Sequence, residues 1–185
     1  MSGRRGNAQP RPVRVVPYDP RWPNDYAEER RRILAALGET IVSLDHIGST
    51  SVPGLGGKPI VDILVGVRNA VDADACLPPL RELGYDDVTP EPQEPDWHYC
   101  LGKRPVPQRP RLLNFHLHLV THRSAHWAKH LLFRDYLRTH PEVARAYYDL
   151  KRRLASRHGS DREGYTAAKT TFIDAVVADA RRLAT

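Results

Sequence analysis

The feature that most constrains this chain is a glycine-rich loop enclosed by two apolar segments. The segments TIVSLDHI at 40–47 and IVDILVGV at 60–67 have the composition of core strands, and the loop GSTSVPGLGGKP at 48–59 joins them. Strands of this kind must be buried in a sheet. Uninterrupted apolar runs such as Ile63 to Val65 are far short of the roughly 20 residues of a membrane span, so we expect no membrane contact.

The spacing of apolar residues predicts the remaining elements. We expect helices over 22–37, 69–83, 124–138, 141–157 and 162–183, and further strands over 85–88, 97–102 and 112–120. The predicted fold is α+β: a mixed sheet of about five strands with helices packed on one side and a helical C-terminal half. The polar residues 1–12 are expected to form a disordered arm, and residues 13–185 a single domain.

The chain is basic, with 28 Lys+Arg against 22 Asp+Glu and a formal net charge of +6. The arginines are spread over the arm, the first helix and the C-terminal half, and they form no single basic block with interleaved aromatic residues. We therefore expect a phosphate-bearing small molecule as partner, and not polymeric nucleic acid. The basic N-terminus has no apolar segment behind it, unlike a secretory signal, which predicts a cytoplasmic protein.

The loop after the first strand has the residues of a phosphate site. Gly48 lets a ligand approach the backbone, the hydroxyl and N–H groups of Ser49, Thr50 and Ser51 suit phosphate oxygens, and Lys58 adds a positive charge. Asp62 lies within the second strand, on the face opposite Val61 and Ile63. A buried carboxylate needs a partner, and a divalent cation bridging to phosphate is one. The alternative is a glycine-rich turn in which Asp62 accepts hydrogen bonds from neighbouring N–H groups.

The segment LLNFHLHLV at 112–120 adds two histidines to this candidate site. Its strict alternation places Asn114, His116 and His118 on one face and the apolar side chains on the other. If this strand is adjacent to that of Asp62, the two imidazoles and the carboxylate form a possible metal site, and imidazole favours transition metals over Mg²⁺. Alternatively, both rings bind phosphate or neighbouring side chains without a metal.

Three basic residues of the helical half are further candidates for phosphate binding. Arg134 has a guanidinium that matches phosphate oxygens bidentately, and Lys151 and Lys169 follow on the next two helices. The alternative for each is a surface ion pair of small energetic value.

Several strings together resemble the GrpB-like proteins, which are predicted members of the nucleotidyltransferase superfamily. They are VVPYDPRWP, DHIGSTSVPGLGGKPIVDILV, NFHLHLV, FRDYLRTHP and YTAAKTTFI, and the resemblance covers about residues 13–180. It implies a nucleotidyltransferase-like fold, with Gly48 and Ser49 in the phosphate-binding turn and Asp62 as the first metal-binding acid. Leu64 stands where the second acid of the superfamily pattern belongs, and the strand that resembles the carrier of the third acid has Asn114, His116 and His118.

The resemblance implies a function that the residues can serve. The leading hypothesis is a protein that binds a nucleoside triphosphate with a divalent metal, Mg²⁺ or Mn²⁺, and transfers a nucleotidyl group to an acceptor, with Asp62 as the catalytic metal ligand. Leu64 favours an alternative, a non-catalytic module that binds a nucleotide or phosphometabolite, linked to CoA metabolism. A further alternative is a metal-dependent hydrolase that uses Asp62, His116 and His118.

Overall fold

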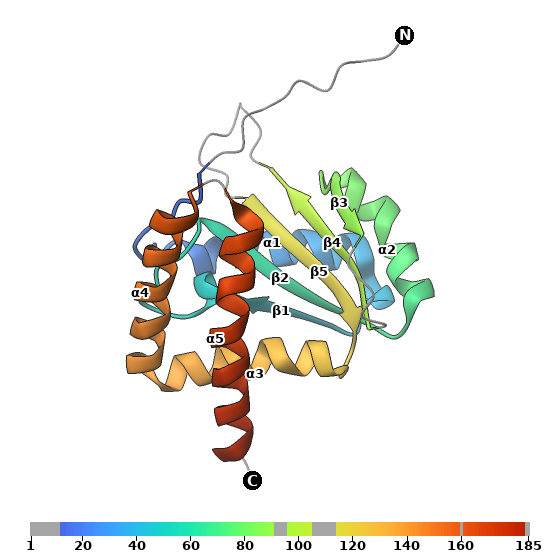
Figure 1. The fold of residues 1–185 in the computed structure, drawn as a ribbon. Helices are drawn as coiled ribbons and strands as arrows, with labels where there is room; N and C mark the ends of the chain where they lie inside the picture. The colour runs from blue at the N-terminus through green and yellow to red at the C-terminus, as the bar shows by residue number, and fades with distance from the viewer. Residues whose placement is uncertain (1–11, 91–95, 105–113, 160, 184–185) are drawn as a thin grey trace.

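The computed structural model of this chain describes residues 12–90, 96–104, 114–159 and 161–183. The arm expected at residues 1–12 therefore lies outside the described residues, apart from Pro12. Figure 1 presents the fold as a twisted sheet crossed by helices, with the C-terminal helix running across the front of the sheet in this view.

The sheet has five strands in the order β1-β2-β5-β4-β3. The central pair, β2 and β5, is parallel, and the other neighbouring pairs are antiparallel. The mixed sheet of five strands predicted from the sequence is thus confirmed. The strands are β1 (Ser43–Ile47), β2 (Ile60–Val67), β3 (Asp87–Pro90), β4 (Trp97–Lys103) and β5 (Asn114–Thr121).

The helices begin and end close to the predicted residues, because their caps are local. The Asn69 side chain accepts a hydrogen bond from the Asp72 N–H, Gly38 ends the first helix with φ 51°, and Asp161 accepts from the Gly164 N–H. The helices are α1 (Trp22–Leu37), α2 (Ala70–Glu82), α3 (Ala125–Thr139), α4 (Pro141–His158) and α5 (Arg162–Leu183), with single 3₁₀ turns η1 (Gly38–Thr40) and η2 (Ser49–Ser51).

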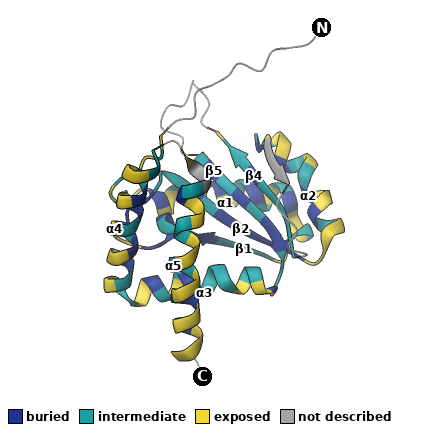
Figure 2. Cartoon of the chain, viewed as in Figure 1, coloured by how far each residue is buried: buried dark blue, intermediate teal, exposed yellow. Residues whose placement is uncertain are grey.

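The main core lies between one face of the sheet and the pair α1 and α2. Val61, Ile63 and Val65 of β2 and Leu117 and Leu119 of β5 have no exposed surface and pack with residues of both helices. Burial of each such side chain contributes about 1.5–3 kcal/mol relative to leaving it in water. Figure 2 shows β2 as mostly buried, β5 as a mixture of buried and intermediate residues, and the outer sides of α2, α4 and α5 as mostly exposed.

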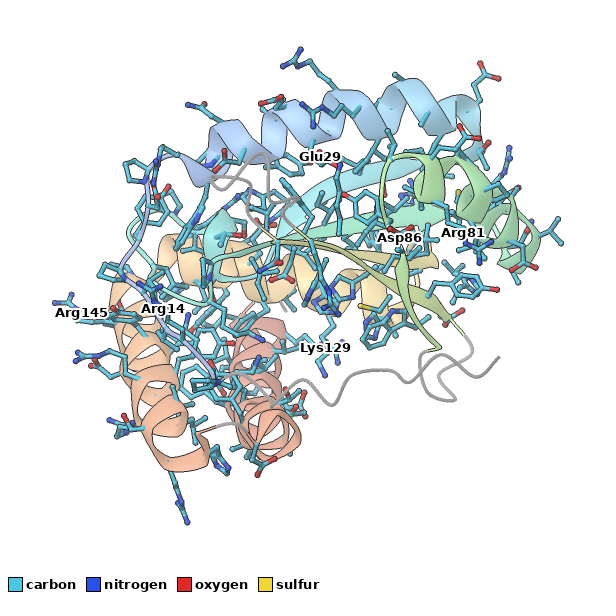
Figure 3. All side chains as sticks on the ribbon, turned by 90° about the horizontal axis from the view of Figure 1, so that it is seen from above. Arg14, Glu29, Arg81, Asp86, Lys129 and Arg145 are labelled. Carbon is cyan, nitrogen blue, oxygen red and sulfur yellow. The ribbon has the colours of Figure 1, made fainter. Side chains whose placement is uncertain are left out.

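The helical C-terminal half begins on the other side of the sheet. Trp127 and Leu131 of α3 pack against Ile47, Leu64 and Val120 from three strands. Helices α3, α4 and α5 then share a separate apolar cluster. Figure 3 shows α1 on one side of the sheet and α3, α4 and α5 on the other, with Glu29 between α1 and the sheet. The α+β class and the helical C-terminal half are confirmed, with the two helices of the N-terminal half together on one side.

Candidate functional site

The predicted adjacency of Asp62 and the two histidines is present in the sheet. In the parallel pair β2 and β5, Asp62 is the register partner of His116, and Leu64 that of His118. The Asp62 Oδ1 atom lies 3.7 Å from His116 Nδ1 and 3.9 Å from His118 Nε2. The two strands therefore bring the candidate carboxylate and both candidate imidazoles together on the sheet face opposite the main core, the same face that packs against α3 at Leu64 and Val120.

Asp62 and His118 stabilise each other's charged forms. Burial alone would raise the pKa of Asp62, but His118, His116 and Lys58 hold it well below its usual range. Burial alone would lower the pKa of His118, but its contacts with Asp62 and Cys100 raise it well above the usual value for histidine. A cation bound at Asp62 would therefore compete with a proton on His118.

The loop that begins at Gly48 packs closely against Asp62. Gly48 has φ 70°, and a Cβ atom built there would lie 2.4 Å from Asp62 Oδ2. Only glycine fits this close approach and backbone conformation without strain. Two of the predicted phosphate residues use their hydroxyls inside the protein: Ser51 Oγ donates to the Gly48 carbonyl at 2.6 Å, and Thr50 Oγ1 lies 3.0 Å from His46 Nε2.

Ser49 is joined to the buried amine of Lys151. The Lys151 Nζ atom donates to Ser49 Oγ at 2.6 Å and to the Gly56 carbonyl at 2.5 Å, and Lys151 is only 2% exposed. Burial, with Lys169 and Lys58 nearby, lowers the pKa of Lys151 to about 7, although Asp62 acts in the opposite direction. This residue from α4 thus ties the loop to the helical half of the protein.

Lys169 and Lys58 approach the same region from α5 and the loop. Their Nζ atoms lie 5.2 Å and 5.6 Å from the centre of the Tyr165 ring. Burial and Lys58 lower the pKa of Lys169 to about 8. The structure therefore gathers all three candidate lysines around Ser49 and Tyr165, within electrostatic range of Asp62.

Arg134 of α3 forms hydrogen bonds with strand β1 and with its neighbour Asp135. Its guanidinium donates to Asp45 Oδ1 at 3.3 Å, to the His46 carbonyl at 3.2 Å and to Asp135 Oδ1 at 2.8 Å. Arg138, one turn later, donates twice to the Ser51 carbonyl, at 2.8 Å and 3.1 Å. The two arginines of α3 hold the loop in shape, and phosphate binding by Arg134 remains a prediction.

The donors fit one divalent ion better than two. Leu64, at the second acid position, has no exposed surface, so β2 offers a single carboxylate where a pair of Mg²⁺ ions requires several. One carboxylate with two imidazoles suits Mn²⁺ or a later first-row transition metal. Among residues 12–90, 96–104, 114–159 and 161–183, no three His, Cys, Asp or Glu side chains are already arranged to hold a metal ion.

Sequence reasoning missed a second histidine group, on α3. His126 and His130 are one helical turn apart, and the ring of Trp97 lies against them. Two histidines at positions i and i+4 of a helix share one face, and this spacing was the available signal.

Comparisons with known proteins match almost all of the described chain to one protein family. The family model described as GrpB protein matches residues 12–179. A UPF0157 protein of Pseudomonas aeruginosa is 36% identical over 92% of this chain and 68% of its own length. The crystal structure of conserved protein GrpB from Enterococcus faecalis is 32% identical with TM-score 0.76, covering 90% of this chain and 96% of that one.

A longer relative carries the name of an enzyme. A dephospho-CoA kinase of Mycolicibacterium paratuberculosis is 30% identical over 85% of this chain, which spans 43% of that protein.

In the described part of this chain, no helix is long and apolar enough to cross a membrane.

Proposed function

The chain belongs to the GrpB family, and we propose that it is a nucleotidyltransferase-like protein that binds the phosphates of a nucleoside triphosphate beside the loop 48–58. One observation carries the proposal: the amines of Lys58, Lys151 and Lys169 converge there, where burial and the neighbouring lysine charges lower the pKa of Lys151 and that of Lys169. Like charges brought together at the cost of desolvation favour an anion that neutralises them.

Each of these groups has a distinct role toward the phosphates. The Lys169 and Lys58 amines both lie near the ring of Tyr165 and supply point charges. Lys151 orients the Ser49 hydroxyl, so that the hydroxyl proton of Ser49 is directed toward a ligand oxygen. Gly48 allows the loop backbone to pass close to Asp62, since a side chain there would strike the carboxylate.

Asp62, with His116 and His118, is the proposed holder of a divalent ion. The distances from Asp62 Oδ1 to the two ring nitrogens, 3.7 Å and 3.9 Å, support a shared ligand. When bound, the ion acts as a Lewis acid on phosphoryl oxygens. Asp62 Oδ2 would lie 2.4 Å from a Cβ atom at Gly48, and this closeness supports an ion site next to the proposed phosphate loop.

The proposed reaction is an in-line displacement at the α-phosphorus. An acceptor hydroxyl loses its proton to solvent, its oxygen bonds to that phosphorus, and the bond from the phosphorus to the bridging oxygen breaks to release pyrophosphate. The lysines neutralise the charge that accumulates on the pyrophosphate. Their place beside the loop supports a role for them in stabilising this leaving group.

A second candidate is a non-catalytic phosphometabolite module. Leu64 in place of an acid favours it, and so does the similarity to part of a protein named dephospho-CoA kinase. On this alternative the same lysines bind the phosphates of a CoA precursor, and no bond is broken.

Calorimetry of the metal-stripped protein with ATP, GTP, CTP and UTP, each with and without Mg²⁺ or Mn²⁺, tests the proposal. We expect metal-dependent binding that Asp62→Asn abolishes and Lys169→Gln weakens. The matched control is Lys129→Gln on α3, whose lysine pairs with Asp174 outside the site. Metal-independent binding of dephospho-CoA alone would favour the second candidate, and absence of binding by folded protein would refute both.

A further inference from the structure

Two histidines of α3 converge on one point beside the polar face of the sheet. The Nε2 atoms of His126 and His130 lie 2.9 Å apart and form a hydrogen bond when no ion is bound. The ring of Trp97 from β4 packs on His126 with centroids 4.2 Å apart, and the ring of His118 stacks at 6.0 Å from that of His130. This histidine cluster (His118, His126, His130 and Trp97) combines residues of β4, β5 and α3.

The cluster contains polar atoms that the described protein leaves unpaired. Within the described part of the chain, three buried side-chain nitrogen or oxygen atoms have no hydrogen-bond partner, and two of them, Trp97 Nε1 and His118 Nδ1, are here. Each such atom costs about 1–3 kcal/mol unless something satisfies it. The indole N–H is only a donor, so it requires an acceptor such as the oxygen of a bound water.

The spacing of the two imidazoles matches two adjacent ligands of one metal ion. With metal–nitrogen bonds of about 2.0–2.1 Å, nitrogens 2.9 Å apart subtend an angle of about 90°. That is the angle between neighbouring ligands in octahedral and square-planar complexes, the geometries of Ni²⁺ and Cu²⁺ with nitrogen ligands. A tetrahedral site would hold the nitrogens about 3.3 Å apart at the same bond length.

We propose that His126 and His130 bind one late first-row transition-metal ion, with water completing its coordination. A metal-bound water would accept the hydrogen bond of Trp97 Nε1, and the nearby His118 Nδ1 would pair with another. The described residues offer no ready set of three ligands, so two imidazoles from the protein are the whole proposed set. Its two ligands differ from those proposed at Asp62, and His118 borders both sites. The proposal does not rest on the proposed nucleotide function.

Titration of the full-length, metal-stripped protein with NiCl₂ and ZnCl₂, without nucleotide, tests this site. We expect the histidine pair to bind one Ni²⁺ equivalent, in addition to any ion held at Asp62, more tightly than Zn²⁺. His126→Ala or His130→Ala should weaken binding of that equivalent about tenfold or more. The control His158→Ala, which removes a histidine of α4 beside Asp161, should keep the wild-type affinity. Equal Ni²⁺ affinity of the wild type and the folded His126→Ala variant would overturn the proposal.

A measurement on the wild type covers the case in which a variant fails to fold. Histidine ring nitrogens observed by NMR should broaden first at His126 and His130 as Ni²⁺ is added in substoichiometric amounts. Broadening that spares both residues, or that begins at His116 instead, would also overturn the proposal.

Discussion

Replacement of Lys151 by methionine should change how the stability of the protein depends on pH. The wild-type amine is 2% exposed, and burial lowers its pKa from 10.5 to about 7. In the unfolded chain the lysine keeps its proton up to about pH 10.5, so the unfolded state binds more protons between these two values. Stability of the wild type therefore rises with pH across this window.

The size of this effect follows from the two pKa values. At 1.36 kcal/mol per pH unit, the penalty of holding Lys151 in the folded protein falls by about 3 kcal/mol between pH 7 and pH 9.5. The variant Lys151→Met has no such titration. The variant also loses the hydrogen bonds to Ser49 and Gly56. That loss lowers the unfolding free energy by the same amount at both pH values, so it cancels in the comparison.

Urea unfolding of both proteins at the two pH values measures the difference. Relative to Lys151→Met, the wild type should gain about 3 kcal/mol of unfolding free energy from pH 7 to pH 9.5. Lys129→Met controls for the loss of one positive charge at an exposed pair. Parallel pH dependence of the wild type and Lys151→Met would refute the claim that burial depresses this amine.

Three further substitutions test the packing and charge of the structure. Gly48→Ala should cost about 2 kcal/mol or more in thermal unfolding and abolish nucleotide binding, because its Cβ would strike Asp62 at φ 70°; wild-type stability would contradict this close approach. Asp62→Asn should lower the pKa of His118 in an NMR titration, because the carboxylate raises it. The pair stabilises the wild type at mildly acidic pH, and this contribution is lost as pH rises through the folded pKa of His118 or falls through that of Asp62, so an unchanged titration would argue against the pair. Glu29→Ala should cost about 3–5 kcal/mol in urea unfolding, because it leaves Lys103 without its buried carboxylate at 2.7 Å; a loss below 1 kcal/mol would mean that the pair is solvated.

Local patterns in the sequence predicted the elements and the faces of the strands. The alternation in LLNFHLHLV places His116 and His118 on the polar side because the side-chain period of a strand is two residues. The caps Asn69 and Asp161 act on N–H groups within three residues, so the helix starts were predictable as well.

The sequence contains no comparable local pattern that predicts contacts between distant segments. The interaction of Lys151 with Ser49 spans 102 residues, and the sequence suggested both as phosphate ligands without indicating that they touch. Arg134 has the composition expected of a phosphate ligand, yet in the fold it contacts Asp45, Asp135 and a backbone carbonyl. Spacing alone does not distinguish these outcomes, since either partner satisfies a guanidinium.

The sequence by itself determined which side chains lie on the polar face of each strand, because pleating acts over two residues. The tertiary structure alone decided that β2 and β5 are neighbours, so that Asp62 meets His116 and His118. It also decided that three lysines from the loop, α4 and α5 converge. The physical reason is that strand order and helix docking are fixed by burial of the whole apolar surface, a property that no local segment contains.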